Sequence, residues 1–145
     1  MPTYVCTVAA GRLTSAQKAE IARNITTIHN EETGAGRYFV QVLFVEIEPG
    51  NHYVADGPAP AEHVWVRGDM RSGRTAEQKN RMLHRIMHDV SKISGISEDS
   101  VWVYLCELSF ESIAEYGRVL VPPGQEDAWF ASLSEAMQER LKTLA

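Results

Sequence analysis

The sequence has little cysteine, no long hydrophobic run and no excess of positive charge. Its two cysteines, Cys6 and Cys106, are typical of a cytoplasmic chain with reduced thiols, although a disulfide between them stays open. No segment approaches the roughly 20 apolar residues of a membrane span, and the first residues lack a basic and then apolar leader pattern. A net charge of -5 argues against nucleic-acid binding driven by bulk charge. We therefore expect a cytoplasmic protein without membrane or nucleic-acid partners.

What the chain does contain is a duplicated unit within one domain of 145 residues. Each unit consists of a strand, a helix opened by a Thr-x-x-Gln capping box, a glycine stop and a second apolar strand. The units cover about residues 2–47 and 63–108, and an offset of 61 positions joins Thr14 to Thr75 and recurs along both units. This tandem β-α-β duplication predicts an α+β fold with a four-stranded sheet and both helices on one face, because such crossovers are right-handed. A C-terminal tail helix is expected at about residues 126–144.

Both faces of the predicted sheet are apolar, although the two helices can cover only one of them. Leu43 points away from Phe44 in the second strand, because successive side chains alternate between the faces. Tyr104 and Val103 repeat this alternation in the fourth strand. An uncovered apolar face of this kind predicts an oligomer in which the sheets are turned inward.

Pro2 is the first candidate for chemistry. A small residue after the initiator methionine normally becomes the terminus of the mature chain, so we expect the chain to begin at Pro2. Its nitrogen would then be a secondary amine that titrates closer to neutrality than a lysine and can act as acid or base. The alternative is that Pro2 merely opens a strand, where its missing N–H costs little.

Four further polar residues stand near the predicted element ends. Arg71 and Arg74 flank a glycine turn before the second helix, where a helix N-terminus and two planar guanidinium groups favour a carboxylate; two solvated surface arginines are the alternative. His29 lies late in the first helix at the edge of its apolar face, and a packing role is its alternative. Glu115, in a loop, is by itself typical of a solvated carboxylate.

These residues together resemble the tautomerase superfamily, and in particular its cis-3-chloroacrylic acid dehalogenase subgroup. That subgroup has a proline after methionine, a histidine late in the first helix and two arginines three positions apart before the second helix. It also has a tyrosine in a W-V-Y run and a glutamate in an E-Y-G-R stretch. The matching residues are Pro2, His29, Arg71, Arg74, Tyr104 and Glu115. The resemblance extends over essentially the whole chain and implies the tautomerase fold and a homotrimer.

The resemblance also implies an enzyme that acts on small unsaturated carboxylates. The two arginines, assisted by His29, would hold the carboxylate of a cis-3-haloacrylate. Glu115 and Tyr104 would activate a water for attack on C3, and protonated Pro2 would give a proton to C2. If Pro2 is neutral, it would instead act as a base in keto-enol tautomerisation of an enol-pyruvate. A third hypothesis is a non-catalytic binding protein on the same scaffold.

No metal or organic cofactor is expected, because the implied chemistry uses only protons and water. His84 and His88 have the i, i+4 spacing of metal ligands on a helix, but the sequence offers them no evident third ligand.

Overall fold

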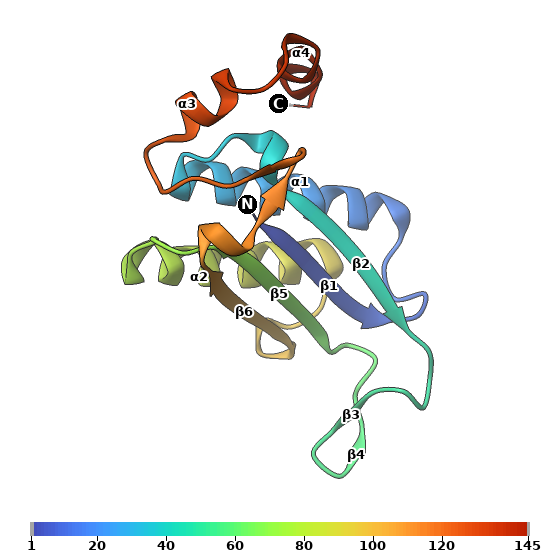
Figure 1. Cartoon of the computed structure of the whole chain (residues 1–145). Coiled ribbons are helices and arrows are strands. Elements are labelled where there is room, and N and C mark those ends of the chain that lie inside the picture. Colours follow the sequence, from blue (N-terminus) through green and yellow to red (C-terminus); the bar gives the residue numbers. More distant parts are fainter. Residues whose placement is uncertain (1, 145) are drawn as a thin grey trace.

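The computed structural model describes residues 2–144, so Met1 and its expected removal lie outside the described residues. A four-stranded sheet in the order β2-β1-β5-β6 forms the centre of the molecule (Figure 1). Its strands are β1 (Thr3–Ala9), β2 (Gln41–Ile47), β5 (Val64–Arg71) and β6 (Val101–Leu108). Each unit pairs its own two strands in parallel, and the antiparallel pair of β1 with β5 joins the units. This is the α+β arrangement, with a four-stranded sheet built from two β-α-β units, that the sequence predicts.

Two long helices cover one face of the sheet, α1 (Ser15–Thr33) and α2 (Ala76–Ser94) (Figure 1). Both begin with the predicted capping box, in which Thr14 and Thr75 accept the N–H groups of Gln17 and Gln78. Both end at a glycine in the left-handed region, with φ of 70° and 71°. None of the helices within residues 2–144 is long and apolar enough to cross a membrane.

The two capping glutamines also tie the helices to each other. The Gln17 side chain donates to the Ile93 carbonyl at 3.0 Å, and the Gln78 side chain donates to the Glu32 carbonyl at 2.7 Å. These two contacts are related by the same offset of 61 positions, so the duplication is also a pseudo-twofold axis between α1 and α2.

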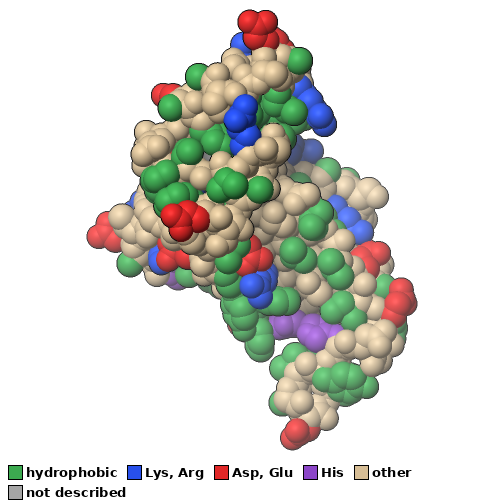
Figure 2. All heavy atoms as spheres, in the orientation of Figure 1, with side chains coloured by type: hydrophobic (Ala, Val, Ile, Leu, Met, Phe, Trp, Pro, Cys, Tyr) green, Lys and Arg blue, Asp and Glu red, His purple; other side chains and the backbone are tan. Residues whose placement is uncertain are grey.

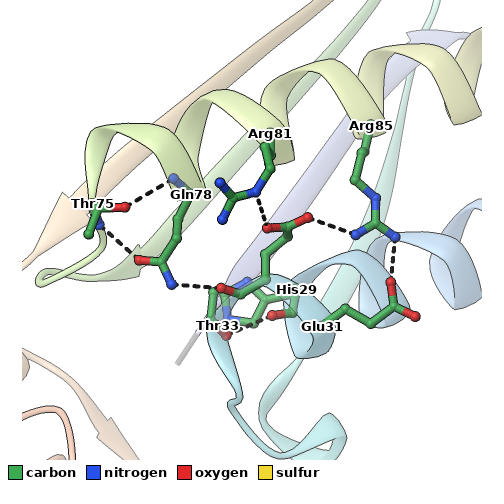
Figure 3. A network of polar contacts seen from close by, with 8 residues as sticks. His29, Glu31, Thr33, Thr75, Gln78, Arg81 and Arg85 are labelled. Atoms are coloured by element: carbon green, nitrogen blue, oxygen red, sulfur yellow. Dashed lines mark hydrogen bonds and ion pairs between the residues drawn. The ribbon is translucent and has the colours of Figure 1, made fainter.

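Ion pairs reinforce one end of this helix pair, where α1 ends (Figure 3). Arg81 and Arg85 of α2 contact Glu32 at 2.8 and 2.9 Å, and Arg85 also contacts Glu31. In the same place Thr33 donates to the backbone carbonyl of His29 at 2.6 Å. The C-terminal end of α1, which carries His29, is therefore held against the start of α2.

The main core lies between the sheet and the two helices, and the opposite sheet face is open. Leu43, Val45, Trp102 and Tyr104 on the open face are 43%, 46%, 43% and 48% exposed. Hydrophobic side chains are visible on the face shown in Figure 2. The predicted second apolar face is therefore present in the single chain.

Short hairpins and a tail complete the chain. The hairpins are β3 (Tyr53–Val54) with β4 (Gly57–Pro58), and β7 (Ala114–Glu115) with β8 (Arg118–Val119). Three-residue helices occur at η1 (Arg37–Phe39), η2 (Glu98–Ser100) and η3 (Phe110–Ser112). The tail packs against η1 through a second apolar cluster. The buried members of this cluster are Phe39, Leu120, Trp129, Leu133 and Leu141.

The single tail helix expected at about residues 126–144 is instead two helices, α3 (Glu126–Ala131) and α4 (Glu135–Thr143). The reason is local capping. Ser134 accepts the Met137 N–H and starts a new helix, as serine often does at an N-cap. The side chain of Gln138 donates to the Leu133 carbonyl at 2.9 Å and fixes the break.

At Gly68 of β5 the packing leaves no room for a side chain. Gly68 lies opposite Tyr4, and a Cβ there would meet the Tyr4 ring at 2.5 Å. We expect Gly68→Ala to lower the free energy of unfolding by about 1–3 kcal/mol through overpacking, measured by urea unfolding. Gly57→Ala is the control, because nothing lies within 4 Å of its added Cβ. Equal losses in both variants would contradict the overpacking argument.

Candidate active site

The candidate site lies where β1 begins. Pro2 is buried directly before β1, and its carbonyl accepts the Gln41 N–H at 3.0 Å. In the antiparallel pair of β1 with β5, Thr3 lies opposite Asp69. The register therefore places Pro2 beside the end of β5, which carries Arg71.

A hydrogen bond between Tyr4 and His29 joins β1 to α1 at this end of the sheet. The Tyr4 hydroxyl lies 2.9 Å from His29 Nδ1, and both side chains are buried. The contacts of the described residues give this hydroxyl no other acceptor, so it donates to Nδ1 and leaves the ring proton on Nε2. Burial raises the pKa of Tyr4, while burial and the nearby Arg74 guanidinium lower the pKa of His29 to about 3. His29 is therefore a neutral imidazole with an N–H at Nε2.

Three buried nitrogens of this region have no hydrogen-bond partner among residues 2–144. They are His29 Nε2, Arg71 Nε and Arg74 Nε. Burying polar nitrogens without partners costs free energy, and an anion is the kind of ligand that accepts hydrogen bonds from such donors. Burial, and the charge of Arg71, lower the pKa of Arg74, while both arginines also act on the pKa of His29. The region is thus a site of concentrated positive charge next to Pro2.

The two arginines differ in their surroundings. Arg71 is 1% exposed; its Nη1 donates to the Val121 carbonyl at 2.7 Å, and its Nη2 pairs with the carboxylate of Glu126. Arg74, just before α2, is partly exposed. Arg71 therefore holds the tail with its terminal nitrogens, and only its Nε is without a partner among the described residues.

Glu115 lies in β7 on the wall of an adjoining hollow of about 770 Å³. Tyr116 and Gly117 make the turn after it with φ of 52° and 78°, the mirror-image turn that suits a tight hairpin. Thr3 and Gln41 line the same hollow, and the backbone N–H of Gln41 is the group that donates a hydrogen bond to the Pro2 carbonyl. The hairpin therefore brings Glu115 to the Pro2 end of the sheet.

Tyr104 is the one predicted site residue that the chain does not bring to this end. It lies on the open sheet face, opposite Arg67 in the strand register, with its ring centroid 5.6 Å from that of Trp65. It lines a different hollow of about 500 Å³, together with His63 and Trp102. Within one chain, Tyr104 and Pro2 are therefore in separate places.

Residues 1–132 match the sequence family described as "Putative oxalocrotonate tautomerase enzyme". The chain belongs to the tautomerase superfamily. The crystal structure of N1, a member of the cis-3-chloroacrylic acid dehalogenase family, is 38% identical over 97% of this chain and 99% of that one, with a TM-score of 0.94. The predicted resemblance to that family is confirmed.

More distant relatives share the fold of this tautomerase. The crystal structure of native Ps01740 is 31% identical over 78% of this chain and 99% of that one, with a TM-score of 0.74. A fused 4-OT, solved as an asymmetric trimer, is 17% identical over 81% of this chain and 94% of that one, with a TM-score of 0.75. None of the curated proteins compared matches the chain.

Two residues near the candidate site were not found by sequence reasoning. Tyr4 forms a hydrogen bond with His29 and orients its ring. The sequence could have indicated Tyr4, because it stands two residues after Pro2 and side chains two positions apart in a strand share a face. Glu126 pairs with Arg71 across 55 positions, a contact that no local pattern indicates.

His88, considered above as a metal ligand, has its Nδ1 atom 2.7 Å from a carboxylate oxygen of Glu98. No group of three potential metal ligands occurs within residues 2–144.

The low pKa of His29 predicts how stability depends on pH. The unfolded chain takes up a proton on this histidine below pH 6.5, but the folded chain does so only near pH 3, so the free energy of unfolding falls as the pH falls between these values. One such group contributes a slope of about 1.4 kcal/mol per pH unit. His29→Asn should remove this component in urea unfolding from pH 7 to about pH 4. The exposed His84→Asn is the control and should retain it; an unchanged slope in His29→Asn would contradict the assignment.

Proposed function

We propose that this tautomerase is a Pro2-dependent enzyme for small unsaturated carboxylates, which hydrates and dehalogenates cis-3-haloacrylates and also catalyses keto-enol tautomerisation. The observation that carries the proposal is the group of buried, unpartnered nitrogens on His29, Arg71 and Arg74 beside Pro2. The similarity to N1, from a family named for cis-3-chloroacrylic acid dehalogenase, supports the same substrate class.

The first step is binding of the substrate carboxylate. Arg74 supplies a partly accessible guanidinium group, Arg71 supplies its Nε and its charge, and neutral His29 donates from Nε2. Holding the carboxylate in this way draws electron density from the conjugated double bond. The C3 atom then becomes electrophilic, which prepares it for attack by water.

The second step adds water across the double bond. Glu115 acts as the general base that takes a proton from water, and the water oxygen forms a bond to C3. The amine of a protonated, chain-terminal Pro2 gives its proton to C2. The resulting 3-halo-3-hydroxypropanoate loses hydrogen halide and leaves malonate semialdehyde, so no oxidant or cofactor is consumed.

Tautomerisation is the second candidate, and burial and the two arginines favour it, whereas the Glu115 carboxylate favours the protonated amine that hydration needs. Burial, together with two neighbouring guanidinium groups, stabilises the neutral form of an amine over its cation. A neutral Pro2 amine takes a proton from the hydroxyl of an enol-pyruvate and returns it to carbon. This route needs no water and therefore no general base at Glu115.

We propose further that the chain works as a homotrimer with its open sheet faces turned inward. The exposed apolar residues on that face support this assembly, and fused 4-OT relatives with the same fold were solved as trimers. Tyr104 lies on this face, away from Pro2 of its own chain. In such an assembly Tyr104 would serve a neighbouring site across the subunit boundary.

The variant Glu115→Gln distinguishes the two proposed reactions, dehalogenation and tautomerisation. In protein verified by mass to begin at Pro2, we expect kcat/KM for halide release from cis-3-bromoacrylate to fall at least 100-fold, in line with loss of a general base. Ketonisation of phenylenolpyruvate should stay within a few-fold of the parent protein. Glu111→Gln, an exposed glutamate in the preceding η3 turn, is the matched control for both assays. If the parent protein catalyses neither reaction, the chain is a binding protein or acts on another substrate class.

The assembly is tested by sedimentation. The molar mass of the parent protein from sedimentation equilibrium should be about three times the 16.2 kDa mass of one chain. Val45→Glu places a charge on the open sheet face and should yield monomers, because a buried unpaired carboxylate is costly. Val119→Glu, on β8 at similar exposure but off the central sheet, should remain trimeric. A monomeric parent protein would overturn the proposed assembly.

A further inference from the structure

Glu126 is a partly exposed acidic residue that pairs with the buried Arg71 of the candidate site. One of its carboxylate oxygens pairs with Arg71 Nη2, and the other accepts the Gly124 N–H at 2.7 Å. Partial burial raises the pKa of Glu126, but the hydrogen bond and charge of Arg71 and the backbone N–H groups of Gly124 and Glu126 together outweigh burial and hold the pKa below its ordinary value. Glu126 is therefore a carboxylate at neutral pH.

The tail that carries Glu126 is seated directly on the arginine loop. Pro123 lies so close to Gly73, between the two arginines, that a Cβ on that glycine would meet the proline ring at 2.9 Å. Arg71 also holds the Val121 carbonyl. The segment that leads to Glu126 is thus held against the arginine loop, which fixes the position of the Glu126 charge.

The field of Glu126 extends to the second arginine. The Glu126 carboxylate acts to raise the pKa of Arg74, against burial and the repulsion from Arg71. The two arginines and Glu126 together carry one net positive charge, although the sequence alone suggests two. An anion bound at Arg74 is attracted by the two arginines and repelled by Glu126.

We propose that Glu126 sets the charge selectivity of the site, so that it accepts monocarboxylates and discriminates against dicarboxylates. The inference rests on the proposed carboxylate-binding function and specifies its substrate class. Removing the Glu126 charge removes one repulsive interaction for a monoanion but two for a dianion. A dicarboxylate should therefore gain more affinity than a monocarboxylate of the same shape.

The test compares isocrotonate with maleate, in which a carboxylate replaces the methyl group of isocrotonate. Binding is measured by calorimetry at low ionic strength and slightly alkaline pH, so that it does not depend on turnover. Glu126→Gln keeps one of the two acceptor oxygens, for either Arg71 or Gly124, and loses the charge. We expect the ratio of the maleate Kd to the isocrotonate Kd to fall about fivefold in this variant.

Two controls separate charge from structure. Asp127→Asn makes the same charge change at the next, exposed residue and should keep the parent ratio. Glu126→Asp retains the charge and should also stay near the parent ratio. An equal gain for both acids in Glu126→Gln, or an unchanged ratio, would overturn the proposal, because Glu126 would then only compete for Arg71 or anchor the tail.

The parent protein gives a separate test if Glu126→Gln does not fold. It must bind isocrotonate more tightly than maleate; tighter binding of maleate would overturn the inference but leave the carboxylate site intact. Binding of neither acid, or binding that Arg74→Ala leaves unchanged, would overturn the carboxylate-binding function itself. The two failures are therefore distinct.

Discussion

Burial of the Arg71 guanidinium is the constraint on which the site and the tail both depend. A buried cation needs hydrogen-bond acceptors and a compensating charge, since its desolvation costs several kcal/mol. The sheet and helices leave this role to the C-terminal segment, through Val121 and Glu126. The tail is thus more than an appended pair of helices, because it completes the electrostatics of the strand end on which it lies. In return, Arg71 fixes where the tail begins.

The scaffold around this constraint is symmetric, but the site is not. The capping boxes and the two glutamine contacts between helices repeat across the pseudo-twofold axis. The candidate site residues do not repeat at the offset of 61. Val90 takes the place of His29 in the second unit, and Trp65 takes the place of Tyr4. A duplicated frame therefore supports a single polar end of the sheet.

Much of this arrangement could be predicted from the sequence, where local signals act. Capping boxes, glycine stops and strand alternation depend on neighbouring residues, so they predicted the central elements and the apolar second face. The family motifs predicted the candidate residues near Pro2. The break in the tail helix was missed, because the cap at Ser134 competes with an amphipathic pattern that runs through it. The pairing of Arg71 with Glu126 joins segments far apart in the chain, and no spacing rule could reveal it.

The pseudo-twofold axis has one more consequence, which concerns the number of reaction centres. The proposed chemistry uses the free amine of a chain-terminal proline, and a chain has one such terminus. His63 stands at the offset of 61 from Pro2, and its backbone nitrogen belongs to a peptide bond without basicity. Joining two β-α-β units into one polypeptide therefore halves the number of amines that two separate units would offer. The start of the second unit's first strand is therefore not required to supply an amine, and it carries His63 and Trp65 at the positions that Pro2 and Tyr4 occupy in the first unit.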